Sequence, residues 1–389
     1  MTAAKDQVIA GFIPLLDSAV LVAAAHRGFA EAEGIDLQLV RETSWANIRD
    51  RIFVGHFDVA HMLAPMPIAS SLKITSLAVP TRAMMGLGTG GNAITLSMDL
   101  ARTLEGHGWS GDLDPMSSAR ALAVAVKERA GRGNDPLRFG VVHPFSGHAY
   151  ELRYWMAAVG VDPDKDVIIR VLPPALMPDA LASGQIDGYC VGEPWNVAGV
   201  SRGIGRIVTC KQAIWPNSPD KVLGVTDGWA IANRDKLDAL MRALSVAADW
   251  CAMPENADDL AGLLSGNEFL DCPKEFCLPA LTKRLPLGTG AEIEIPGFIT
   301  FGGGEFAAPR IDYGLWFYSQ MVRWGQALYT ESDLAVVTRV FDDTYYRRAL
   351  GLPLDRQTDI TSSPVALFDG LAFSAPDVAG YVSQFPVKA

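Results

Sequence analysis

Four short segments place polar or flexible residues where a predicted strand ends, where a helix begins or among turn residues. In "HPFSGHAYELRYW", Ser146 has the character of a helix cap, so His148 lies in the first turn of the predicted helix. The first turn of a helix presents unpaired backbone N–H groups and the positive end of the helix dipole, which together can bind an anion. A surface or capping histidine would show the same pattern, so the residues alone leave both interpretations open.

Gly192 lies in "GYCVGEPWN", where a predicted strand runs into a helix opened by Glu193 and Pro194. A glycine at the carboxyl end of a strand lets backbone amides approach a ligand, and α/β proteins bind ligands at such ends. We expect Glu193 to orient a neighbouring histidine or lysine. A plain strand–helix turn with proline at the first helical position is the alternative.

Lys221 and Asn92 lie in segments rich in turn residues and glycine. Lys221, in "WPNSPDKVLGV", would supply a full positive charge to an anion if it faces a cleft, and is solvated otherwise. Asn92 follows the glycines of "GTGGNAITLS", which lack GxGxxG spacing and favour a close approach of backbone to a ligand or a crossover between lobes. The Asn92 amide could donate a hydrogen bond there.

Motifs of catalysis and metal binding are missing from the sequence. There is no GxSxG, HExxH or P-loop, and the five cysteines form no CxxC pair. We therefore predict free thiols, no catalytic residue, no metal and no cofactor. His61 is interpreted as a histidine at the edge of the core, and the "CPKEFC" segment as structural.

The arrangement of predicted elements favours a two-lobed α/β protein. Strands predicted at 6–15, 35–41, 57–63 and 74–80 alternate with helices. A second series begins near residue 137, and 177–191 repeats the layout of 48–62: a helix, a glycine turn, an acidic step and a buried strand. We predict lobe I at 1–92 and 213–389, with the C-terminal helices wrapped on it, and lobe II at 93–212, with a ligand cleft between the lobes.

Composition and charge limit the possible partners. The 389-residue chain has a net charge of −11 and no Lys/Arg run, which argues against nucleic acid, and no apolar run is long enough to span a membrane. The N-terminal "MTAAKDQVIAGFIPL" shows no secretory signal. The expected location is therefore cytoplasmic, or periplasmic if an export signal has been removed.

Taken together, "SWANIRD", "LRYWMAAVGV", "GYCVGEPWN" and "IWPNSPDKVLGVT" resemble the nitrate/bicarbonate-binding proteins of ABC transporters. The resemblance runs from about residue 8 to about residue 350 and implies a periplasmic-binding-protein-like (type II) fold with an anion closed in the cleft. It implies ligand-binding positions at Trp45, His148, Gly192 and Lys221, with Asn92 as the best placement for a side-chain amide. Trp45 alone would be read as a core residue; the resemblance makes it the flat wall of an anion site.

The resemblance also suggests what the chain binds and why. Bicarbonate binders of the family replace the basic pair with acidic or amide residues and recruit a metal, so His148 and Lys221 favour nitrate or nitrite. The start of the chain resembles the cytoplasmic branch, which implies a nitrate sensor that controls an RNA-binding transcription antiterminator and has no enzymatic activity. The alternative is a substrate-binding component that delivers nitrate or bicarbonate to an ABC permease.

Overall fold

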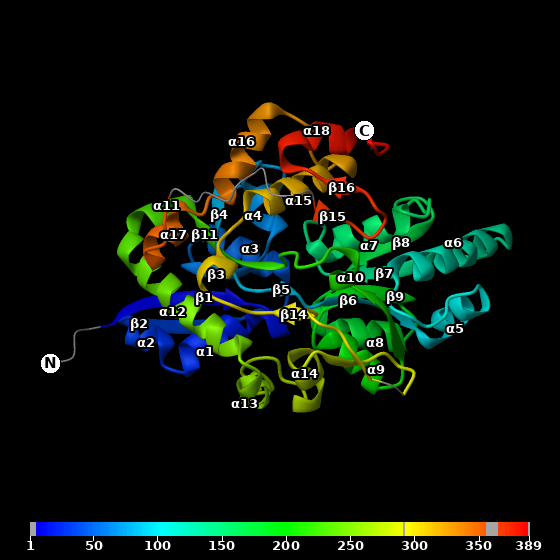
Figure 1. Cartoon of the computed structure of the whole chain (residues 1–389), viewed down its shortest axis with the longest axis horizontal. Helices are drawn as coiled ribbons and strands as arrows, with labels where there is room; N and C mark the ends of the chain where they lie inside the picture. Colours follow the sequence, from blue (N-terminus) through cyan, green and yellow to red (C-terminus); the bar gives the residue numbers. More distant parts are fainter. Residues whose placement is uncertain (1–4, 291, 355–364, 388–389) are drawn as a thin grey trace.

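Two five-stranded sheets, each covered by helices, form the framework of the molecule (Figure 1). The computed structural model describes residues 5–290, 292–354 and 365–387. Each sheet mixes parallel and antiparallel strands, and the two sheets share one pattern of connections. This α/β arrangement is the one that the alternation of strands and helices predicts.

The first sheet has the strand order β2-β1-β3-β11-β4. β1 is parallel to β2 and β3, whereas β11 runs antiparallel to β3 and β4. Its strands are β1 (Asp6–Phe12), β2 (Ile35–Arg41), β3 (Val59–Leu63), β4 (Thr81–Gly86) and β11 (Lys221–Thr226). The strand predicted at 74–80 is wrong: these residues form bends and loop, and β4 begins only after Pro80.

The second sheet has the order β10-β6-β9-β7-β8 and repeats the pattern of the first. β7 is parallel to β8 and β9, and β6 runs antiparallel to β9 and β10. Its strands are β6 (Asn92–Ser97), β7 (Leu137–Val141), β8 (Val167–Val171), β9 (Gly188–Gly192) and β10 (Gly205–Cys210). β6 therefore corresponds to β11, since each enters its sheet antiparallel to the central parallel strands.

Helices connect the strands and bury their apolar faces against the sheets. Close packing is strict at Gly11 in β1, where an added Cβ would lie 2.3 Å from the Phe57 ring. The helices up to β11 are α1 (Ala19–His26), α2 (Phe29–Ala32), α3 (Trp45–Phe53), α4 (Pro65–Ser71), α5 (Met98–Gly106), α6 (Pro115–Gly131), α7 (Gly147–Ala157), α8 (Met177–Ala182), α9 (Trp195–Ser201) and α10 (Lys211–Ile214), with short 3-10 helices at Leu16–Ser18 and Pro174–Leu176.

The chain crosses between the sheets twice, after β4 and after β10. The two crossing segments are joined to each other, because Gly90 N donates to Ser218 O at 3.1 Å. The short strand β5 (Thr89–Gly90) in the first crossing pairs with β14 (Ile299–Thr300). The glycine-rich segment is thus a crossover, one of the two interpretations that the sequence left open. Asn92 is already the first residue of the second sheet; the exact lobe boundaries stay a prediction.

The C-terminal elements contact helices of both sheets. α12 packs on α1 and α17, and α15 packs on α4 and also reaches α7. α14 packs on α9, beside the second sheet. These elements are α11 (Asp227–Ala232), α12 (Arg234–Ala252), α13 (Ala257–Leu264), α14 (Lys274–Leu281), α15 (Ile311–Arg323), α16 (Glu331–Val340), α17 (Thr344–Leu350) and α18 (Val378–Ser383), with 3-10 helices at Pro254–Asn256, Gly304–Ala307 and Ala375–Asp377 and strands β12 (Arg284–Pro286), β13 (Glu292–Glu294), β15 (Val365–Ala366) and β16 (Ala372–Phe373).

No helix of the described residues has the length and apolar character required to cross a bilayer. All five cysteines are free thiols; Cys272 and Cys277 have sulfur atoms 3.7 Å apart without a disulfide.

Candidate functional site

The antiparallel strands β6 and β11 bring their first residues to the carboxyl ends of the parallel strands. Asn92 begins β6 and pairs with Gly192, the last residue of β9. Lys221 begins β11 and pairs with Leu63, the last residue of β3. In α/β proteins this edge of a sheet is where ligands bind. Each sheet therefore contributes to the site through the same structural device.

Two serine-capped helices bring Trp45 and His148 to the same region. The Ser44 hydroxyl accepts a hydrogen bond from Asn47 N at 3.2 Å, and the Ser146 hydroxyl accepts one from Ala149 N at 3.0 Å. Trp45 is the first residue of α3 and His148 the second of α7. The predicted helix starts at both positions are confirmed.

Lys221 is completely buried and paired with two carboxylates. Its Nζ donates to Asp17 Oδ2 at 2.8 Å and to Asp220 Oδ2, and lies 5.6 Å from the centre of the Trp45 ring. Burial by itself lowers the pKa of Lys221, but Asp17 and Asp220 outweigh it and raise the pKa above its ordinary value. Lys221 is therefore charged, yet its charge is already balanced, contrary to the free positive charge expected from the sequence.

Asp220 links Lys221 to the second sheet. Asn92 Nδ2 donates to Asp220 Oδ1 at 2.9 Å and to Glu151 Oε2 at 3.3 Å. Lys211 Nζ donates in turn to Glu151 Oε1 and lies 4.0 Å from Asp220 Oδ1. Burial opposes the charge of Asp220, but Lys221, His148 and Lys211 outweigh it and hold the pKa of its carboxyl far below the usual range.

His148 faces the same carboxylate. Its Nε2 lies 3.9 Å from Asp220 Oδ2, and neither ring nitrogen has a hydrogen-bond partner among the described residues. Burial lowers the pKa of His148 to about 3, although Asp220 acts in the opposite direction. His148 is therefore neutral near pH 7, because desolvation disfavours the imidazolium more than one carboxylate stabilises it.

Gly192 closes the site from the β9 side. A Cβ added there would lie 3.3 Å from Asn92 Oδ1, 3.4 Å from Leu15 Cδ2 and 3.5 Å from Asp17 Oδ2. These distances are at or slightly below ordinary van der Waals contact. A larger side chain at this position would therefore press on Asn92 and Asp17. The structure thus gives Gly192 a spatial reason beyond its role in a strand–helix turn.

The five residues predicted from the sequence form one cluster. Trp45 lies against Lys221, Lys221 contacts Asp220, and Asp220 contacts both Asn92 and His148, while Gly192 pairs with Asn92. All five positions are buried, with Trp45 only 1% exposed. Because the cluster draws side chains from both sheets, a ligand here would be held by both.

Sequence reasoning missed several members of this cluster, namely Asp17, His61, Glu151, Lys211 and Asp220. His61 Nδ1 accepts from Ile13 N at 3.4 Å and Nε2 lies 3.0 Å from Asp17 Oδ1, so Nε2 carries the hydrogen of a neutral ring. Its interpretation as a core-edge residue overlooked this contact. Asp220 directly precedes Lys221, a signal that was available; Asp17 and Glu151 had no local signal of their own.

Glu193 does not have its expected role. Its Oε2 accepts from Val197 N at 3.1 Å, inside its own strand–helix turn, and its carboxylate is not bonded to any described histidine or lysine. Burial raises the pKa of Glu193 to about 8. The expectation that Glu193 orients a basic residue is therefore wrong, because the start of α9 takes up its side chain.

Within residues 5–290, 292–354 and 365–387, no group of three or more His, Cys, Asp and Glu side chains is arranged to hold a metal ion.

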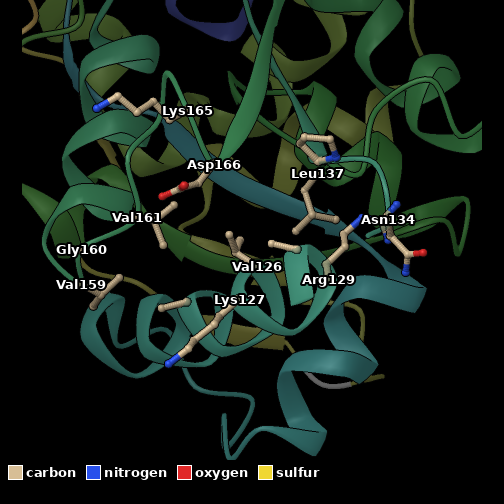
Figure 2. A pocket seen from close by; sticks show the side chains of 13 residues that line it. Val126, Lys127, Arg129, Asn134, Leu137, Val159, Gly160, Val161, Lys165 and Asp166 are labelled. Carbon is tan, nitrogen blue, oxygen red and sulfur yellow. The ribbon is translucent and has the colours of Figure 1, made fainter. Parts of the chain in front are cut away.

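A separate hollow lies on the outer side of the second sheet, between α6, β7 and the loop that follows α7 (Figure 2). Its volume is about 460 Å³. Figure 2 shows Val126, Leu137 and Val161 gathered around it. None of the five predicted residues lines it, so it is distinct from the buried cluster.

The sequence of the chain matches a known protein family. A model of the NMT1-like family matches residues 2–265. The chain belongs to the NMT1-like family. It is also 34% identical to the bicarbonate transport ATP-binding protein CmpC of Synechococcus elongatus over 97% of this chain and 54% of the relative, so the chain spans about half of that protein.

Binding proteins match over most of their length. The nitrate/nitrite binding protein NrtA of Synechococcus elongatus is 28% identical over 98% of this chain and 86% of the relative. The crystal structure of the periplasmic nitrate-binding protein NrtA from Synechocystis PCC 6803 superposes with a TM-score of 0.88 at 25% identity, covering 99% of both chains. These matches confirm the resemblance and the predicted periplasmic-binding-protein-like fold. The chain is thus similar, over most of its length, to proteins whose names describe nitrate binding.

Proposed function

We propose that this chain binds a small planar oxyanion, nitrate or bicarbonate, at the buried cluster between the two sheets, as the solute-binding part of an ABC transporter. The observation that carries the proposal is the convergence of Trp45, Asn92, His148, Gly192 and Lys221, which are far apart in the sequence, on one point between the carboxyl edges of both sheets. The names of the relatives, which describe nitrate and bicarbonate binding and transport, support it.

A planar oxyanion matches the aromatic face and the N–H donors of this cluster. Trp45 offers an indole face and an Nε1–H that lacks a partner among the described residues. Neutral His148 offers one N–H, and the starts of α3 and α7 offer backbone N–H groups. A delocalised oxyanion accepts hydrogen bonds in its own plane and can lie against an aromatic wall, so these groups suit it.

Ligand entry requires the two sheets to move apart. The cluster is buried on all sides, and the two crossing segments that join the sheets, near Gly90 and Ser218, are the natural place for bending. A ligand stabilises the closed form only as far as it binds that form more tightly than the open one. The same closed form is what a permease partner of a solute-binding protein would recognise.

The cytoplasmic sensor with an antiterminator partner, expected from the sequence, gains no support from these relatives, whose names describe transport and binding. The location of the chain stays a prediction.

Isothermal titration tests the binding proposal. Nitrate, nitrite and bicarbonate are titrated at equal ionic strength, with chloride and sulfate as controls of different shape. We expect saturable binding of one ion per chain for a planar oxyanion and none for sulfate. Absence of binding for all three planar ions would contradict the proposal. Uptake of labelled nitrate and bicarbonate by cells lacking the gene then tests the transport role; unchanged uptake of both would contradict that part alone.

A further inference from the structure

Two cysteine sulfur atoms lie in contact at the start of α14. Cys272 Sγ and Cys277 Sγ are 3.7 Å apart, and either thiol can donate a hydrogen bond to the other. Among the described residues no other two cysteine sulfur atoms are in contact, and the three remaining thiols, Cys190, Cys210 and Cys251, are buried. The interpretation of the "CPKEFC" segment as structural does not account for this contact.

The backbone around the pair allows a bond between the two sulfur atoms. A disulfide joins sulfur atoms at about 2.0 Å, so these two would have to approach each other by roughly 1.7 Å. Cys272 lies in a bend before Pro273, the N-cap of α14, and its side chain is therefore not held by the helix. Cys277 is the fourth residue of α14 and stays in place. The movement required is confined to the Cys272 side chain and the bend that carries it.

The two thiols differ in exposure and in acidity. Cys272 is half-buried, whereas Cys277 is completely buried. The hydrogen bond from Cys277 and the charge of Arg41 lower the pKa of the Cys272 thiol, although burial and two nearby carboxylates oppose them. The hydrogen bond to Cys272 and burial raise the pKa of the Cys277 thiol. Because the thiolate is the reactive form, Cys272 is the thiol that meets an oxidant first.

α14 contacts helices that lie beside both sheets (Figure 1). It packs on α13, which contacts α1 at the first sheet, and on α9 at the second. A bond between Cys272 and Cys277 would tie the bend before α14 to the first turn of this helix. Neither cysteine belongs to the buried cluster around Lys221, so an inference from the pair does not depend on the proposed function.

We propose that Cys272 and Cys277 are a reversible oxidation site whose oxidant is a small-molecule disulfide. The Cys272 thiolate attacks one sulfur of the small disulfide, which forms a mixed disulfide and releases a thiolate that takes up the proton lost by Cys272. Cys277 then loses its proton and attacks Cys272 Sγ. The Cys272–Cys277 bond forms, and the second small thiol leaves with that proton. Two protein thiols are thus oxidised by two electrons, and one small disulfide is reduced to two thiols.

Counting thiols in the unmodified, folded chain tests the proposal. The reduced protein is treated with oxidised glutathione at mildly alkaline pH, desalted, unfolded and alkylated, and the labelled thiols are counted by mass spectrometry. We expect two of the five thiols to disappear, no glutathione to stay bound, and dithiothreitol to restore all five. Peptide mapping should find Cys272 joined to Cys277 within one chain. Five free thiols after treatment, a stable glutathione adduct on Cys272 or a bond between two chains would overturn the proposal.

Single serine variants test the roles of the two thiols. In Cys277→Ser, Cys272 should keep one bound glutathione, because no neighbouring thiol remains to displace it. In Cys272→Ser, the buried Cys277 should keep none. Cys251→Ser is the matched control: Cys251 is buried without a sulfur contact, so this variant should still form the bond.

The opposite pattern, with glutathione retained in Cys272→Ser and none in Cys277→Ser, would overturn the assignment of Cys272 as the attacking thiol. If a serine variant does not fold, the thiol count of the unmodified chain still decides whether the bond forms.

Discussion

The helix starts of α3 and α7 have almost the same backbone and carry different chemistry. Ser44 has φ −141° and ψ 149°, and Ser146 has φ −142° and ψ 150°; each caps its helix through its hydroxyl. The first puts the indole of Trp45 into the cluster and the second the imidazole of His148. The charge of the Trp45 indole is independent of pH, whereas the His148 imidazole titrates. The fold thus places the first turn of a serine-capped helix beside the cluster at two points. The type of residue in that turn decides the chemistry.

Lys221 and Asn92, the first residues of β11 and β6, form a second matched pair. Here the two variants should differ more in the unfolding free energy that they lose. Lys221→Met would leave Asp17 and Asp220 without their ammonium partner, so we expect a loss of about 3–5 kcal/mol of unfolding free energy. Asn92→Leu removes a neutral donor and should cost about 1–3 kcal/mol. Urea denaturation near neutral pH measures both. Similar losses for the two variants would show that Lys221 does not hold these carboxylates together.

His148 should make stability fall with acid, and Trp45 should not. The folded pKa of His148 is about 3, below the ordinary value of about 6.5, so as pH drops through this window the unfolded chain takes up a proton that the folded chain does not. His148→Gln should therefore reduce the slope of unfolding free energy below about pH 6 by up to about 1.4 kcal/mol per pH unit.

The matched control for that slope is Trp45→Phe. His61 and His143, whose pKa values are also lowered by burial, contribute slopes of the same sign in both variants. Denaturant titrations at a series of pH values give the slopes. If the slope in His148→Gln equals that of the unmodified chain, the pKa of His148 does not change on folding and this prediction is contradicted.

Trp45→Phe should also weaken anion binding about tenfold, or roughly 1.4 kcal/mol, because it removes the only hydrogen that the indole can donate and keeps most of the apolar contact. Calorimetric titration with bicarbonate and nitrate measures this. Trp45→Ala is a poorer variant, since the side chain is 1% exposed and its loss would cost about 3–5 kcal/mol of stability. Unchanged affinity in Trp45→Phe would return Trp45 to a packing role.

The smallest expected effects concern the two caps themselves. Ser44→Ala should cost about 1 kcal/mol, because it removes one hydroxyl acceptor from one helix N–H. Ser146→Ala should cost more, because its buried hydroxyl also donates to His143 O at 2.6 Å. Thermal or urea unfolding would detect the difference from the unmodified chain. A larger loss in Ser44→Ala than in Ser146→Ala would contradict this order.

Local sequence patterns indicated His148, Gly192, Lys221 and Asn92, and the family resemblance added Trp45. Contacts between residues distant in the sequence were missed. Serine before each helix, glycine at the end of β9 and the strand preceding Lys221 are visible in short windows, and the structure places them together. The pairing of Lys221 with Asp17, 204 residues earlier, has no local pattern. The neutral state of His148 could not be predicted either, because it follows from burial between two sheets.

The indole N–H signal of Trp45 in a proton–nitrogen NMR spectrum tests the central claim most directly. The signal is assigned by its loss in Trp45→Phe, and the spectrum is recorded during titration with bicarbonate and with nitrate. Trp155, whose Nε1 donates to Pro115 O at 2.9 Å, serves as the internal reference. We predict that the Trp45 signal shifts and saturates with the calorimetric affinity while that of Trp155 stays in place. Measurable binding heat with an unmoved Trp45 signal would contradict the site described above.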